Sequence, residues 1–205
     1  MRAPRPSSLA WVVLALVAGL TLLGWNYWHH GVPPKVFNAM MSTRLGNRIE
    51  QYALKVTSPP APKGIKTLGP GDRMPDWTLP AAQGKPQSFA QWNGKRVLVN
   101  FWATWCAPCL QEMPALAQAQ RLYANHGVQV VGIALDDAAT VQRFLKAHPP
   151  AYPMLIGSDM DPDPLLVLGD TRRAMPYSVL IDRHGRIERT HLGPLGAAQL
   201  AHWLR

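Results

Sequence analysis

The spacing of hydrophobic and polar positions divides the chain into three parts. Residues 9–28 form an apolar run without a single charged residue, and a helix of about 20 such residues can cross a hydrocarbon layer of roughly 30 Å. Residues 37–54 repeat apolar side chains at helical spacing, with basic residues between them. From residue 67 onwards, short apolar runs alternate with amphipathic segments, which is typical of a domain of mixed strands and helices.

Two near-continuous apolar runs, at residues 96–102 and 128–135, predict strands that are buried on both faces of a sheet. The other elements are predicted from periodicity and from the turn residues that separate them. The expected strands are 76–79, 86–89, 96–102, 128–135, 154–156, 178–182 and 187–191, and the expected helices are 107–125, 138–147, 164–168 and 197–204. This order predicts an α/β fold with a mixed central sheet and helices on both faces.

The flanks of the first apolar run indicate a membrane anchor. Arg2 and Arg5 precede the run, and the positive-inside bias would keep this short arm cytoplasmic. Trp25, Tyr27 and Trp28 close the run, where their rings favour the membrane interface. A cleaved signal peptide would instead end in small residues, so we expect an uncleaved signal-anchor.

Three parts follow from these patterns. Residues 1–28 are expected to form a cytoplasmic arm and a transmembrane signal-anchor, residues 29–66 a membrane-proximal helix and a proline-rich linker, and residues 67–205 the globular domain. The helix predicted within residues 29–66 fits two interpretations equally well. It is either a basic amphipathic helix on the membrane surface or a helix packed on the domain.

The charge distribution supports the membrane interpretation. The chain has a formal net charge of +9, yet residues 1–66 hold eight of the basic residues against Glu50 alone. The remaining residues carry thirteen basic and eleven acidic side chains, a net charge of +2. No groove-reading motif accompanies the basic residues, so we expect no nucleic-acid partner.

The chain has two cysteines, Cys106 and Cys109, in the sequence WCAPC. A purely structural disulfide over so short a loop would add on the order of 2 kcal/mol of stability. A structural zinc site needs four ligands, usually a second cysteine pair or closely spaced histidines, and the sequence has no such second pair. Haem attachment needs a histidine directly after the second cysteine, where this chain has Leu110. We therefore expect a redox-active Cys106–Cys109 disulfide, with no metal and no other cofactor.

The predicted position of the cysteines, between a buried strand and the first turn of a helix, favours thiol chemistry. Free amides and the dipole at a helix N-terminus stabilise a thiolate, and Pro108 is well tolerated in a first turn. Cys106, at the tip, is expected to attack a substrate disulfide, and Cys109 to resolve the mixed disulfide.

Three neighbouring side chains complete the expected site. Glu112 lies one helical turn beyond Cys109 on the same face, where it fits a proton exchange with Cys109 and, equally, a carboxylate that complements the helix dipole. Trp102 and Trp105 flank the cysteines. Packing is the default expectation for both rings, and Trp105 would also shield the sulfurs.

A family resemblance extends this interpretation. The sequences VLVNFWATWCAPCLQEMPAL at 97–116, VVGIALDD at 130–137 and MPYSVLIDRHGRI at 175–187 resemble the TlpA/ResA-like membrane-anchored thioredoxin-fold thiol–disulfide oxidoreductases. The resemblance implies a thioredoxin-like fold, a bacterial inner (cytoplasmic) membrane location and a single pass, with the catalytic domain facing the periplasm.

The resemblance also implies roles for particular residues. Pro176 matches a cis-proline that faces the cysteine pair, and the backbone before it, at Met175, would pair with the substrate. Met175, Pro176 and Trp105 are therefore the expected substrate-binding residues, and Glu112 is implied as the proton-exchanging residue. Tyr177 departs from the family pattern, because the cytochrome c maturation branch has a glutamate there. Arg172 and Arg173, near the expected site, are interpreted as solvated surface residues.

The expected function is the reduction of disulfides in selected extracytoplasmic proteins, such as apocytochrome c or proteins with copper-site cysteines. The periplasm is kept oxidising, so the pair would need electrons from a membrane thiol-transfer protein of the DsbD/CcdA-like kind. Two alternatives stay open: an oxidase that donates disulfides, and a metallochaperone that binds Cu(I) through two thiolates. A peroxidase is disfavoured, because Thr104 and Cys106 have the wrong spacing.

Overall fold

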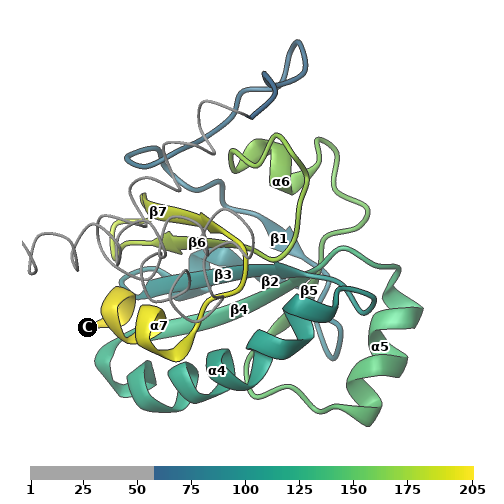
Figure 1. Cartoon of the computed structure of the whole chain (residues 1–205), viewed down its shortest axis with the longest axis vertical. Helices are drawn as coiled ribbons and strands as arrows, with labels where there is room; N and C mark the ends of the chain where they lie inside the picture. Colours follow the sequence, from purple (N-terminus) through teal and green to yellow (C-terminus); the bar gives the residue numbers. More distant parts are fainter. Residues whose placement is uncertain (1–57) are drawn as a thin grey trace, which may run out of the picture. The chain divides into compact units, whose positions relative to one another are not determined.

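A five-stranded mixed sheet forms the centre of the domain in the computed structural model of the chain, which describes residues 58–205 (Figure 1). The strands follow the order β5–β4–β3–β6–β7. Their bounds are Arg96–Trp102 for β3, Val128–Ala134 for β4, Met154–Ile156 for β5, Tyr177–Ile181 for β6 and Ile187–Leu192 for β7. Strands β3, β4 and β5 are parallel, whereas β6 and β7 run antiparallel to their neighbours. The predicted mixed sheet is confirmed.

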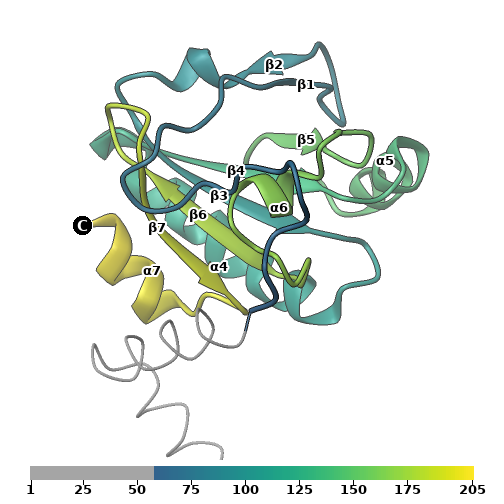
Figure 2. The same cartoon turned by 90° about the horizontal axis from the view of Figure 1, so that it is seen from above.

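The smaller elements are a two-stranded hairpin, two 3₁₀ helices and four α-helices. Their bounds are Thr78–Leu79 for β1, Gln87–Ser88 for β2, Phe89–Trp92 for η1, Ala107–Tyr123 for α4, Ala124–His126 for η2, Ala138–Ala147 for α5, Pro164–Val167 for α6 and Ala197–Leu204 for α7. Figure 2, seen from above, has α6 in front of the strands and α4 behind them. The prediction of helices on both faces is confirmed.

Alternate residues of β3 supply the two halves of the core, as expected for a strand buried on both faces. Leu98 and Trp102 pack in one cluster with Leu116 of α4 and Trp203 of α7. The intervening residues of β3 pack in the other cluster, against α6, η1 and the hairpin. Members of this second cluster are Val97, Val99, Phe101, Leu79, Phe89, Trp92, Leu165 and Leu168. The sheet is therefore fully covered around β3, the strand that leads to the cysteines.

The predicted bounds agree with the structure to within two residues, and the two 3₁₀ helices were not predicted. The expected strand 86–89 ends at Ser88, because the Ser88 side chain accepts a hydrogen bond from Ala90 N at 3.1 Å and caps the unpredicted 3₁₀ helix η1. The expected helix 107–125 ends at Tyr123 and continues as the 3₁₀ helix η2. Gly127, with a φ of 78°, closes that turn in the left-handed region that favours glycine.

The domain is anchored at its start by backbone hydrogen bonds. Leu68 N donates to the Val167 carbonyl at 2.7 Å, and Gly71 N donates to the Ile187 carbonyl at 2.8 Å. The predicted anchor at residues 9–28 and the predicted helix at 37–54 lie outside the described residues. Between residues 58 and 205, no helix combines the length and the hydropathy needed to span a bilayer.

Candidate active site

Cys106 ends the turn that joins β3 to α4, and Cys109 lies in the first turn of α4. Cys106 is the N-cap of α4, and its backbone N–H donates to the Ala103 carbonyl at 3.1 Å. Cys109 N donates to Cys106 Sγ at 3.3 Å, and the two sulfurs form a disulfide with a Cα–Cα distance of 5.3 Å. Thr104 N donates to Asp136 Oδ2 at 2.5 Å, so the loop between β4 and α5 fixes the approach to the cysteines.

The two cysteines differ in access to solvent. Cys106 keeps 5% of its surface exposed, whereas Cys109 is completely buried. A protein substrate can therefore reach Cys106 only, which agrees with the expected order of attack and resolution. Because Cys106 caps the helix, the Cys109 N–H points towards its sulfur and stabilises its thiolate.

The two tryptophans next to the cysteines have opposite environments. Trp102 is fully buried in the core, as expected, but Trp105 is 71% exposed. The expectation that Trp105 packs was wrong, because the turn from β3 into α4 points this side chain away from the core. Sequence periodicity does not resolve the direction of a side chain in a short turn. Trp105 instead presents a large apolar surface directly before Cys106.

Glu112 is buried beneath the cysteines, with 4% of its surface exposed. Asn100 Nδ2 donates to Glu112 Oε1 at 2.7 Å, and Leu195 N donates to Glu112 Oε2 at 2.6 Å. Burial raises the pKa of Glu112 from 4.5 to about 7, although both hydrogen bonds lower it. The carboxyl can therefore gain and lose a proton near neutral pH, one helical turn from Cys109.

The partners of Glu112 were missed in the sequence. Asn100 is the one polar residue among the apolar residues 97–102, and this is the local signal that could have singled it out. Leu195 contributes only its backbone N–H and gives no such signal. Tyr152 is also buried, and burial and the charge of Glu112 both raise its pKa. These residues come together only through the packing of distant segments.

The predicted cis-proline lies beside the end of β3. The Met175–Pro176 peptide bond is cis, which confirms the resemblance on this point. Tyr177 pairs with Phe101 in the antiparallel register, so the sheet brings Met175 and Pro176 next to the turn that carries the cysteines. Pro176 is buried and Met175 half-buried, and Gly193 N donates to the Pro176 carbonyl at 2.8 Å.

A carboxylate organises the loop before the cis-proline. Asp170 is buried and accepts hydrogen bonds from Arg172 N at 3.1 Å and Ala174 N at 2.7 Å. Arg173 has a φ of 53°, and its Nε lies 2.6 Å from Asp163 Oδ2. Both arginine side chains are exposed, as expected.

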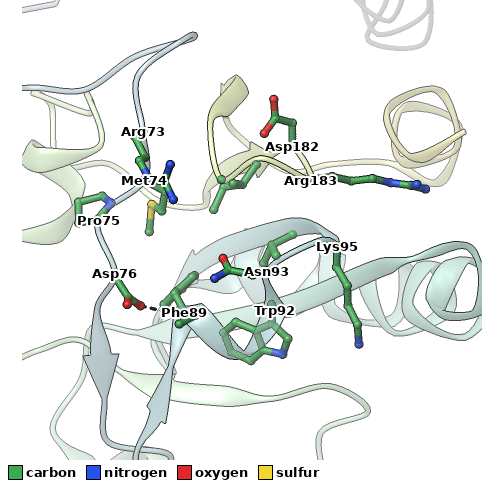
Figure 3. A pocket seen from close by; sticks show the side chains of 14 residues that line it. Arg73, Met74, Pro75, Asp76, Phe89, Trp92, Asn93, Lys95, Asp182 and Arg183 are labelled. Carbon is green, nitrogen blue, oxygen red and sulfur yellow. Dashed lines mark hydrogen bonds between the residues drawn. The ribbon is translucent and has the colours of Figure 1, made fainter.

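A separate pocket lies between residues 73–76, the 3₁₀ helix η1 and the β6–β7 turn (Figure 3). None of the predicted site residues lines this pocket. Its carboxylates already accept hydrogen bonds from nearby groups: Asp76 from Ser88 Oγ and Ala90 N, and Asp182 from His184 N and Arg186 N. Within residues 58–205, no group of three or more His, Cys, Asp or Glu side chains is placed to hold a metal ion.

Exchange of two electrons between cysteine sulfurs is the chemistry that this geometry supports, and together with the fold it places the chain among the thioredoxin-like thiol–disulfide oxidoreductases. More specifically, the chain belongs to the Redoxin family, which it matches over residues 69–201.

Named relatives and a solved structure agree with this placement. The thioredoxin-like protein YneN of Bacillus subtilis is 33% identical over 132 residues, which cover 61% of this chain and 72% of that protein. The thiol-disulfide oxidoreductase ResA of Halalkalibacterium halodurans is 29% identical over 124 residues, 60% of this chain and 68% of ResA. A thiol:disulfide interchange protein of the thioredoxin family from Chlorobium tepidum has a TM-score of 0.53 at 27% identity, covering 65% of this chain and 96% of that one.

Proposed function

We propose that this oxidoreductase is a membrane-anchored reductant for disulfides in selected extracytoplasmic proteins. The observation that carries the proposal is the arrangement of the cysteines, with an accessible Cys106 at a helix N-terminus above a buried Cys109 and a buried Glu112. The direction of electron flow is supported by the apolar run at residues 9–28 and by the resemblance of residues 97–116 to the TlpA/ResA-like family.

The reaction begins with the reduced pair. The Cys106 thiolate attacks one sulfur of the substrate disulfide, that S–S bond breaks, and the other substrate sulfur leaves as a thiolate that takes up a proton. A mixed disulfide now joins Cys106 to the substrate. Cys109 then attacks Cys106 Sγ, the mixed disulfide breaks, and the second substrate sulfur leaves as a thiolate that also takes up a proton. The substrate has gained two electrons and two protons, and the enzyme holds the Cys106–Cys109 disulfide.

Glu112 handles the proton of the resolving step. Cys109 is completely buried, so its thiol has no bulk water to which it can release a proton. The ionised Glu112 carboxylate, one helical turn away, accepts the proton while Cys109 attacks. A pKa of about 7 suits this transfer, because both protonation states are populated near neutral pH.

Substrate proteins dock on the surface around Cys106. The exposed Trp105 ring offers an apolar contact directly before the attacking sulfur, and the Met175 backbone, before the cis bond to Pro176, offers a peptide edge. Candidate substrates are apocytochrome c and proteins with copper-site cysteines. Spent enzyme would be reduced again by a DsbD/CcdA-like membrane thiol-transfer protein, with the domain on the periplasmic side of the bacterial inner membrane.

Trapping of the mixed disulfide tests this function. In cells that express the full chain, Cys109→Ala should accumulate mixed disulfides through Cys106, because the resolving thiol is gone. Non-reducing electrophoresis followed by mass spectrometry would identify the attached proteins. Cys106→Ala is the matched control and should trap none, because the remaining thiol is buried. The proposal is wrong if the Cys109→Ala protein carries no more adducts than this control.

A further inference from the structure

A row of buried polar side chains crosses the sheet beneath α4. Asn100 of β3 pairs in register with Ser178 of β6, and Ser178 pairs in register with His191 of β7. Asn100 Nδ2 donates to Glu112 Oε1 at 2.7 Å and also approaches Ser178 Oγ at 3.1 Å. Asn100 and Ser178 are completely buried, and His191 keeps 8% of its surface exposed. The row therefore runs from Glu112 to the ring of His191.

The His191 ring is held on several sides. Gln199 Nε2 lies 3.4 Å from His191 Nδ1, and the ring also donates a hydrogen bond to the Pro194 carbonyl. A neutral ring that accepts from Gln199 at Nδ1 carries its proton on Nε2. Nε2 faces the turn, since a Cβ built on Gly193 would lie 3.8 Å from it. Trp203 packs edge-on against the ring at a centroid distance of 5.9 Å. Burial lowers the pKa of His191, which favours this neutral form.

The turn between β7 and α7 connects His191 to the site. Gly193 N donates to the Pro176 carbonyl at 2.8 Å, Pro194 accepts from His191, and Leu195 N donates to Glu112 Oε2 at 2.6 Å. Three consecutive residues thus contact the cis-proline, the histidine and the buried carboxyl. A backbone N–H can hold a carboxylate only if its own peptide is fixed, and in this turn that peptide joins Pro194 to Leu195.

We propose that His191 is a positioning residue, which fixes the turn 193–195 so that the Leu195 N–H stays on the Glu112 carboxylate and the Gly193 N–H stays on Pro176. His191 acts on Glu112 through this turn. The turn 193–195 thereby positions both the Glu112 carboxylate and the Pro176 backbone beside which a substrate would dock. The inference rests on the proposed function for its catalytic meaning, but the contact with Glu112 can be tested without any substrate.

Other titratable groups near the two side chains are accounted for as follows. Tyr152 and Cys109 face Glu112 from the segment before β5 and from α4 itself, and in the oxidised protein Cys109 does not titrate. On the side of His191, the Arg189 guanidinium lies 5.5 Å from the centroid of the Trp203 ring. A titration of the oxidised protein near neutral pH thus reports on Glu112 without interference from a thiol.

The experiment is a pH titration of the Glu112 carboxyl by carbon-13 NMR. The chain contains three glutamates, Glu50, Glu112 and Glu188, so glutamate labelled at the carboxyl carbon gives three resonances. The Glu112→Gln variant identifies the signal of interest by its loss. The sample is the full chain in detergent, in the oxidised state. The wild-type signal should titrate near pH 7, and the Glu188 signal serves as an internal reference.

His191→Phe keeps a ring of similar size but cannot donate to Pro194. Leu195 N then loses its fixed position, and because its hydrogen bond lowers the pKa of Glu112, the midpoint should rise by about one pH unit. His191→Gln retains a donor and should restore the wild-type midpoint. His202→Phe, at an exposed position of α7, is the matched control and should leave the midpoint unchanged.

An unchanged Glu112 midpoint in folded His191→Phe would overturn the proposal, as would equal shifts in the Phe and Gln variants. If His191→Phe does not fold, Gln199→Leu, which frees Nδ1 only, should still move the midpoint upward, and no shift there would also overturn it. Failure of the proposed function looks different. In that case Glu112→Gln leaves disulfide exchange unchanged, while the carboxyl titration still responds to His191.

Discussion

At the scale of single residues, burial gives different roles to side chains that the sequence places within seven positions. Cys106 is reachable and lies at a helix N-terminus, whereas Cys109 is sealed from solvent. Glu112 is buried as well, but two hydrogen bonds keep its ionised form accessible. Attack, resolution and proton transfer can thus proceed in sequence within the first two turns of one helix.

Glu112→Gln should change both stability and rate. The folded-state pKa of Glu112 is raised from 4.5 to about 7, so its contribution to stability is fully present below pH 4.5 and is lost as the pH rises through 7. Relative to Glu112→Gln, the oxidised wild type should lose up to about 3 kcal/mol of unfolding free energy across this range. Urea denaturation at several pH values measures the difference.

The same variant should reduce a protein disulfide more slowly, on the order of a hundredfold at neutral pH, because no carboxylate accepts the Cys109 proton. Circular dichroism controls for an intact fold. Parallel stability profiles for the two proteins would contradict the buried titration, and equal exchange rates from about pH 5 to about pH 8 would contradict the proton transfer.

Trp105→Ala should weaken substrate binding without destabilising the protein. The side chain is 71% exposed, so its removal leaves no cavity, and the free energy of unfolding should change by less than about 0.5 kcal/mol. KM for a protein disulfide should rise about tenfold with little change in kcat, since an exposed aromatic ring beside the reactive sulfur contributes contact area. Leu122→Ala, also at an exposed apolar position, is the control and should leave KM unchanged.

The residues of the site that could be predicted lie close together in the sequence. Cys106, Cys109 and Glu112 share one helical turn and its neighbour, so spacing alone relates them. Spacing could not relate Asn100 or Leu195 to Glu112. Asn100 lies on a different element, β3, and Leu195 lies 83 positions from Glu112 and contacts it through its backbone N–H. The family resemblance, and not spacing, indicated Pro176.

At the scale of elements, one strand and one loop position the turn that carries the cysteines. Strand β3 is buried on both faces and delivers the chain to the cysteines, while the β4–α5 loop fixes Thr104 through Asp136. The next residue, Asp137, caps the helix α5, because its Oδ1 accepts a hydrogen bond from Thr140 N at 2.9 Å. Two neighbouring aspartates thus hold the active-site turn and the start of α5.

These two aspartates make a matched pair of variants. Asp137→Ala removes a helix cap and should cost about 1 kcal/mol of unfolding free energy, with disulfide exchange unchanged. Asp136→Ala removes the acceptor of Thr104 N and should slow exchange, since the turn before Cys106 is then less fixed. Urea denaturation and an exchange assay on both proteins separate the effects. Slower disulfide exchange in Asp137→Ala, with unchanged exchange in Asp136→Ala, would contradict the role assigned to Asp136.

Element prediction succeeded where periodicity was strong and failed where a side chain decided the local structure. The apolar run 96–102 could only be a buried strand, and its bounds agree with β3. The 3₁₀ helix η1 was missed, because the Ser88 cap and not an apolar repeat turns the chain there. Sequence periodicity detects repeated burial, and a single capping hydrogen bond leaves no repeat.

At the scale of the whole molecule, the direction of electron flow decides the function. The geometry of the cysteines supports exchange in either direction, since CxxC proteins span roughly 150 mV in reduction potential. The proposed membrane anchor and electron donor would keep this domain reduced in an oxidising compartment. Most of the net positive charge, +7 of the total +9, also lies in residues 1–66, where an anionic membrane surface would attract it.

The resting redox state of the Cys106–Cys109 pair in cells tests the central claim most directly. Acid quenching followed by thiol alkylation separates the reduced from the oxidised full-length protein by mass. A reductase should be found mainly reduced, and should become oxidised when the membrane electron supply is removed. A pair that is fully oxidised with the electron supply intact would contradict the account and indicate an oxidase instead.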